Sequence, residues 1–279
     1  LSGSLVYESR SPRPLLSGKV ESEELQFRDL APLIGARVSS DKDGGGEELP
    51  SKILPSAPFR PERWRVMDAD VEFTGDHVFR DYELPIHKVD THIVMNDAVL
   101  SLEPLKFRYA YGDVQSIMRF DGRSAPIKAT MDLSARGMQL NHVFPGVVEG
   151  KNVTLGLANG EAKLNASGDS IGALLGATNG ELKLVLDNGT VSKALIETAG
   201  LNVPNIIITK LAGDKQVKID CAAADLVASN GVFDSRVFVI DTDIARFDVT
   251  GKVDLGREWL DLIVRTNSKG VRLLSLRSP

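Results

Sequence analysis

The second half of the chain alternates apolar and polar residues with a period of two. Leucine recurs at every second position of the run ELKLVLD (181–187), and Phe247 and Val249 alternate with Asp248 in the run ARFDVTG (245–251). A period of two places one set of side chains on one face of a strand. The pattern therefore predicts a mainly β protein whose strands each have an apolar face and a polar face.

Three short segments have a helical period instead, at residues 30–34, 169–179 and 192–201. In the second, Asp169 or Ser170 is expected to cap the helix, and Ile171, Leu174 and Leu175 are expected to seat it on the end or side of the sheet. Two or three short helices cannot cover a sheet of about a dozen strands, on the usual strand lengths. We therefore expect repeated antiparallel meanders that form an elongated, curved sheet, and the alternation leaves open whether it is an open groove or a partly closed barrel or sandwich.

Asn-Gly pairs recur in the same region. Those within 158–161, 187–190 and 229–232 are flanked by alternating apolar residues, which predicts hairpin turns, because this pair tolerates positive φ. The pair Asn179-Gly180 is expected to end the short helix, with Gly180 as its left-handed C-terminal residue.

The chain also resembles itself at an offset of 133 residues. DAVLSL at residue 97 aligns with NGVFDS at 230, RFD at 119 with KVD at 252, and SARGMQL at 134 with NSKGVRL at 267. Such self-similarity is typical of repeated supersecondary units, and it predicts an elongated body.

Residues 37–58 combine Gly, Ser, Pro and charge with few apolar residues, which predicts a flexible linker or disordered loop. It would separate residues 1–36, interpreted as the end of an upstream repeat, from a β-rich domain over 59–279. Its three glycines are not followed by the Lys-Ser/Thr ending of a phosphate-binding loop.

Net charge, apolar run length and cysteine count argue against several classes of function. A net charge of -5 without basic clusters argues against nucleic acid as a partner. No run of about 20 apolar residues is present to span a membrane. The single cysteine, Cys221, cannot form an internal disulfide and is interpreted as a small core residue.

Candidate chemistry is sparse. The four histidines have no metal-ligand spacing, and a solvated strand face explains Asp68, Asp70 and Glu72 better than a calcium site does. Cys221 has no neighbouring histidine to activate it. The expectation is a protein that is not an enzyme and has no cofactor or metal.

Two long segments carry a family resemblance. The run from Leu164 to Val191, LNASGDSIGALLGATNGELKLVLDNGTV, and the run from Asn230 to Val264 resemble the C-terminal region of the AsmA family. LLSGKVESEELQFRDLAPLIG and ILPSAPFRPERWRVMDADVEF upstream resemble the segments that precede it in larger members. The resemblance implies a periplasmic protein tethered to the inner membrane by an N-terminal transmembrane helix outside this chain. It also implies a role in outer-membrane biogenesis and, through chorein-type bridge proteins, phospholipid movement along an apolar groove.

Two functions follow as hypotheses. In the first, the apolar faces bind or conduct phospholipid or another acyl-chain ligand; in the second, the chain is a non-enzymatic β scaffold that assists outer-membrane protein assembly through protein contacts. Under the first, the residues expected to line the groove are Leu155, Leu157, Leu182, Leu184, Leu186, Phe238, Ile240, Phe247, Val249, Leu260 and Leu262.

Overall fold

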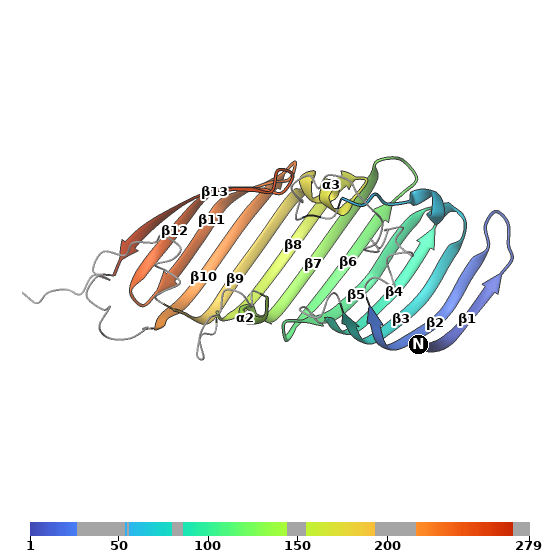
Figure 1. The fold of residues 1–279 in the computed structure, drawn as a ribbon, viewed down its shortest axis with the longest axis horizontal. Coiled ribbons are helices and arrows are strands. Elements are labelled where there is room, and N and C mark those ends of the chain that lie inside the picture. Colours follow the sequence, from blue (N-terminus) through green and yellow to red (C-terminus); the bar gives the residue numbers. More distant parts are fainter. Residues whose placement is uncertain (27–53, 55, 80–85, 144–154, 193–215, 270–279) are drawn as a thin grey trace, which may run out of the picture.

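The computed structural model describes residues 1–26, 54, 56–79, 86–143, 155–192 and 216–269. All strands in these ranges form one 13-stranded sheet, in which the spatial order of the strands is their order along the chain (Figure 1). The sheet is open, since β1 and β13 are its two edges and do not pair with each other. The predicted elongated β meander is therefore confirmed, in its open form. The strands are β1 (Ser2–Glu8), β2 (Leu15–Gln26), β3 (Asp68–Phe79), β4 (Ile86–Asn96), β5 (Val99–Tyr109), β6 (Gly112–Asp121), β7 (Ile127–Gln139), β8 (Leu157–Gly168), β9 (Asn179–Ser192), β10 (Gln216–Ser229), β11 (Val232–Thr242), β12 (Ala245–Asp254) and β13 (Trp259–Ser268).

Every neighbouring pair is antiparallel except β2 and β3, which are parallel. A parallel pair needs a long connection, because the chain must return to the end at which it started. That connection, residues 27–67, contains the whole predicted linker, 37–58, which largely lies outside the described residues. The helices predicted over 30–34 and 192–201 lie outside them as well, apart from Ser192 itself, the last residue of β9.

The internal repeat is reproduced strand by strand. β5 and β11, and likewise β6 and β12, begin and end at positions that are 133 residues apart. Equivalent positions also have equivalent burial, as Val114 is 5% exposed and Phe247 is 3% exposed. The repeat is therefore a repeat of meander strands, as the self-similarity predicts.

The Asn-Gly predictions are correct at one hairpin out of three. Asn230 and Gly231 make the β10–β11 turn with φ of 49° and 78°. The pairs at 159–160 and 188–189 lie inside β8 and β9, so those two predicted turns are wrong. Continuous pairing with the adjacent strands overrides the local turn preference at both places.

Gly180 is also not a helix cap. It lies in β9 opposite Leu164, with a φ of +134°. A Cβ there would be 2.0 Å from the backbone oxygen of Lys163 on β8. Glycine is required because the two backbones approach too closely for any side chain.

Short helices lie where the strands end, two along one rim of the sheet and one, a single turn after β7, along the opposite rim (Figure 1). The predicted helix is α3 (Ile171–Gly176), capped by Ser170, whose Oγ accepts a hydrogen bond from the Ala173 N–H at 3.1 Å. Leu174 is buried and Leu175 is half-buried, as expected for residues that seat the helix, whereas Ile171 is 36% exposed and does not share this role. A 3-10 helix, η1 (Pro61–Arg65), and a single helical turn, α2 (Leu140–Val143), were not predicted.

The segment that precedes β3 contacts several strands and turns along the rim that carries α3 and η1. The Leu54 N–H donates to Glu258 Oε1 at the β12–β13 turn (3.0 Å), and the Phe59 N–H donates to the Asp169 oxygen beside α3 (2.7 Å). Trp64 of η1 then packs in a buried cluster with four residues of β4, β5 and β7 and the turns beside them, namely Met95, Ala98, Leu100 and Ile127. Residues from most of the sheet's length are thus linked at one rim.

Asp68 anchors the beginning of β3. Its buried carboxylate accepts hydrogen bonds from Arg10 (3.2 Å), Arg13 (3.0 Å) and the Asp97 N–H (3.2 Å). Burial by itself raises the pKa of Asp68, but the bonds from Arg13 and Asp97 and the arginine charges outweigh it, so the net pKa is lowered. The carboxylate therefore stabilises the fold as an anion, rather than lying on a solvated strand face as predicted.

Asp68→Asn is expected to cost about 3 kcal/mol at pH 7, since it removes one partner of a buried charged network. Because the folded-state pKa lies below the unfolded value, the carboxylate's contribution is complete above the unfolded pKa of about 3.9 and is lost as the pH falls through the folded pKa. Urea unfolding at pH 7, 5 and 3 should show the difference between wild type and variant shrinking toward acid. A difference that stays constant over this range would contradict the role of the charge.

Candidate functional site

The register of the sheet sorts its side chains into two chemically different faces. One row of paired positions contributes a single residue from each of the 13 strands, and every one of them is apolar or glycine. We call the face that carries this row the apolar face and the other the polar face. The row reads Leu5, Gly18, Val71, Ile93, Leu102, Met118, Met131, Leu164, Gly180, Ala228, Phe233, Val253 and Leu260.

The apolar face has no second layer over it in the described part of the chain. The strands contact the strands beside them, and the helices that add to this are α3 against β8, α2 against β7, and Trp64 of η1 at the rim. Figure 1 accordingly shows one layer of strands with the helices at the strand ends. A face of this size would normally be covered in a soluble domain.

Large and small side chains alternate across the apolar face. Leu184 of β9 leans over Gly160 of β8, where a Cβ would lie 2.7 Å from its Cδ2. On the other side, Leu184 is paired with Ala224 of β10, which is 9% exposed. The leucines of β9 therefore pack sideways over small neighbours, and their outer surfaces are not covered by another described element.

Few polar side chains lie on the apolar face. The Ser116 hydroxyl donates to the Asp132 oxygen (2.9 Å), and the Thr242 hydroxyl donates to the Ala245 oxygen (2.6 Å). These two hydroxyls are satisfied by the sheet's own backbone. The buried hydroxyls of Thr91 and Ser235, on the same face, have no hydrogen-bond partner among the described residues. Most of the face nevertheless offers area for contact rather than hydrogen bonds to a ligand.

Ion pairs between strands cover the polar face. Arg136 of β7 pairs with Glu161 of β8, and Arg236 of β11 pairs with Glu181 of β9 at 2.9 Å. In each case the hydrogen bond from the arginine, followed by its charge, lowers the pKa of the glutamate. The carboxylates are thus held ionised, so that this face is strongly hydrated and only the other one is suited to an apolar ligand.

The structure brings most of the predicted lining residues together. Leu157 is an exception, because it is paired with Asp187 on the polar face and is 44% exposed. Leu155 precedes β8 and does not belong to a strand. The other predicted lining residues share the apolar face, namely Leu182, Leu184, Leu186, Phe238, Ile240, Phe247, Val249, Leu260 and Leu262.

The prediction missed the part of the apolar face that lies on β3 to β7. Its strands carry larger side chains than β8 and β10 do, such as Phe107 and Met131. Alternation is interrupted there by Pro104, beside which the β5–β6 register shifts. The offset of 133 residues could have located it, because Leu105 and Phe107 correspond to Phe238 and Ile240.

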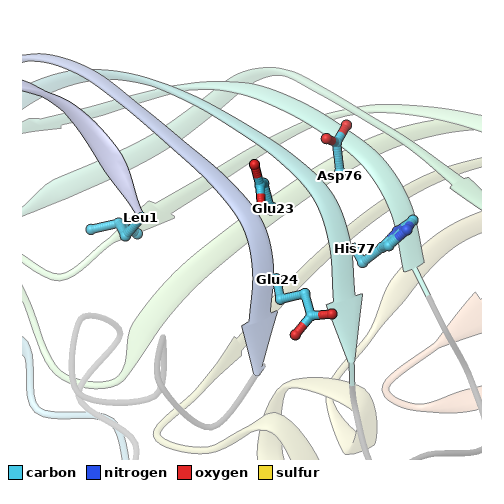
Figure 2. Close-up of a pocket in the computed structure, with 5 residues that line it drawn as sticks. All are labelled: Leu1, Glu23, Glu24, Asp76 and His77. Atoms are coloured by element: carbon cyan, nitrogen blue, oxygen red, sulfur yellow. The ribbon is translucent and has the colours of Figure 1, made fainter.

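Two pairs of histidine or acidic side chains lie within contact distance of each other. His92 Nε2 lies 2.7 Å from Asp70, and the Nδ1 atoms of His77 and His87 are 3.4 Å apart. Figure 2 shows a depression beside β2 and β3 that is lined by Leu1, Glu23, Glu24, Asp76 and His77, and it is polar rather than apolar. In the described ranges, no three His, Cys, Asp or Glu side chains are arranged to hold a metal ion.

Cys221 is exposed, so the prediction that it is a core residue is wrong. It is paired with Asp187 and Asp241 on the polar face, since the register of β10 points its alternate residues, Ala222 and Ala224, to the apolar face.

Comparison with known proteins identifies the family. The AsmA family model matches residues 1–238. The AsmA family protein YhjG of Escherichia coli (strain K12) is 42% identical over 287 aligned positions, which cover 99% of this chain and 42% of that protein. The chain thus spans less than half the length of this relative. No solved structure matches, and in the part of the chain that the structure describes no helix is long and apolar enough to cross a membrane. The family model matches well over half of the sequence, and the chain belongs to the AsmA family.

Proposed function

We propose that the apolar face binds the acyl chains of phospholipids, as part of a periplasmic AsmA-family protein that acts in outer-membrane biogenesis. The observation that carries this proposal is the row of 13 apolar or glycine residues that crosses the whole sheet without a polar interruption. A contiguous apolar surface larger than a few hundred Å2 requires a partner in water. A tether to the inner membrane and contacts with outer-membrane components belong to the same proposal.

The chemistry of the face supports a ligand that is long and apolar. An acyl chain gains free energy from burying area and needs no hydrogen bonds, so the scarcity of ligand-facing polar groups is compatible with it. Specificity for the headgroup would be low, since the headgroup would stay in water at a rim of the sheet. The proposal requires binding and passage of lipid, without catalysis.

The test uses photo-crosslinking residues at neighbouring positions that face opposite ways. Leu184 and Leu262 lie on the apolar face and are at least partly exposed, whereas Val185 and Val237 are apolar and exposed but lie on the polar face. We expect crosslinks to phospholipid at the first two positions only, and phospholipid in organic extracts of the purified chain by mass spectrometry. Equal labelling at all four positions, or a chain free of lipid, would leave the alternative of a β scaffold that acts through protein contacts.

A further inference from the structure

Two histidines face each other near one end of the apolar face. His77 of β3 is paired directly with His87 of β4. An even number of residues separates His77 from Val71 of the apolar row, so both side chains lie on the same face of β3. Directly paired residues of an antiparallel ladder also share a face. The two imidazoles are therefore neighbours through the strand register.

The separation of the two rings fits a shared metal ion. Their Nδ1 atoms are 3.4 Å apart, and their centroids are 5.0 Å apart with an angle of 86° between the ring planes. A strong hydrogen bond from an N–H group spans about 2.7–3.2 Å, which is shorter than this contact. A tetrahedral Zn2+ ion with Zn–N distances of about 2.0–2.1 Å holds two ligand nitrogens about 3.3–3.4 Å apart and their ring centroids about 5.2 Å apart. Both measured separations are close to these values.

The surroundings of the pair favour a cation that retains water ligands. Glu24 of β2 is paired with His77 and lies on the strand beside it in Figure 2, so it adds a carboxylate to the same face. His77 is exposed and His87 is half-buried, which leaves room for water to complete the coordination. Within the described ranges no three His, Cys, Asp or Glu side chains are arranged to hold an ion, so the two imidazoles would be the protein ligands there. Imidazole suits zinc, copper and nickel.

We propose that His77 and His87 form a binding site for a divalent transition-metal ion such as Zn2+, with water in the remaining coordination positions. The ion would connect β3 to β4 near one end of the apolar face. The spacing of the histidines along the chain does not indicate this site, because its ligands come from two paired strands rather than from one helix. The proposal stands independently of lipid binding, since it rests on the geometry of the two rings alone.

Calorimetric titration of the purified chain with ZnCl2 measures the affinity of the site. We expect one ion per chain. His77→Gln and His87→Gln should each weaken binding at least about tenfold, because even an indirect partner of a metal ligand typically contributes about 10–100-fold. His92→Gln is the matched control, since His92 also belongs to β4 but its Nε2 lies 2.7 Å from Asp70 on the polar face, and its loss should leave the affinity unchanged. Circular dichroism checks that each variant is folded.

Cobalt distinguishes this site from scattered binding to surface carboxylates. Four-coordinate Co2+ absorbs visible light strongly, whereas six-coordinate Co2+ held by carboxylates and water absorbs weakly. The wild-type chain and His92→Gln should give the strong spectrum, and the double variant His77→Gln/His87→Gln should not. Zinc affinity that is unchanged in His77→Gln and His87→Gln, an equal loss in His92→Gln, or a six-coordinate Co2+ spectrum of the wild type would overturn the proposal.

Discussion

Gly180→Val is expected to lower the free energy of unfolding by at least about 4 kcal/mol, enough to leave much of the chain unfolded at 37 °C. The new Cβ would lie 2.0 Å from the Lys163 oxygen, and the backbone φ of +134° is unfavourable for a β-branched residue. The clash is with backbone, so β8 and β9 must separate to relieve it. Urea unfolding followed by circular dichroism measures the loss.

Gly137→Ala is the matched control for this variant. Gly137 also has a positive φ, of +68°, but nothing lies within 4 Å of the position that a Cβ would take there. Its replacement should cost only about 1 kcal/mol, from backbone strain. Equal losses for the two variants would mean that strain, rather than the approach of the two strands, explains the need for glycine at 180.

Trp64→Ala is expected to cost about 3–5 kcal/mol, since it removes a large aromatic side chain from a closed cluster. Trp64 is 4% exposed, packs with Met95, Leu100 and Ile127, and has its Cε3 2.7 Å from where a Cβ of Gly122 would be. Loss of the side chain would release η1 and, with it, the segment that ties the rim. Thermal unfolding with intrinsic fluorescence of the remaining tryptophan, Trp259, reports both stability and the state of the β13 edge.

Trp64→Phe separates the contribution of the packed ring from the cost of its unpaired N–H donor. The buried Nε1 of Trp64 has no hydrogen-bond partner among the described residues. Phenylalanine removes this unsatisfied donor while keeping a ring, so the loss should be well below that of alanine. A melting temperature that Trp64→Ala shifts by less than about 3 °C would show that η1 does not hold the rim.

The predicted turns show where local sequence rules lose to pairing between strands. The Asn-Gly pairs at 159–160 and 230–231 have the same residues, but the first is flanked by β7 and β9 over its whole length, while the second lies at the end of a strand pair. Turn preference is a local term of the backbone, whereas a strand in the middle of a sheet gains hydrogen bonds and packing on both sides. Only the register of the neighbours distinguishes the two cases.

The sequence predicted only part of the apolar face, again because a local pattern does not show which strands become neighbours. Strict alternation located the apolar residues of β9, β11, β12 and β13, since a period of two fixes their face without reference to any partner. It misassigned Leu157, because the alternation of β8 is carried by Ala158 and Ala162, whose small side chains are a weak hydrophobic signal. Ala158 and Ala162 are nonetheless buried, at 6% and 4% exposure.

Repeated two-sided strands could be predicted from the amino-acid sequence, since alternation, strand length and the 133-residue offset are properties of neighbouring or equivalent positions. Three features appear only in the folded molecule: the sheet stays open, 13 strands align their apolar residues into one uninterrupted row, and Trp64 and the segment beside α3 connect one rim. These features depend on contacts between residues far apart in the chain, and the same alternation is compatible with a closed sandwich. The strand register and the open or closed form of the sheet depend on the sum of these long-range contacts. A local sequence pattern does not contain that information.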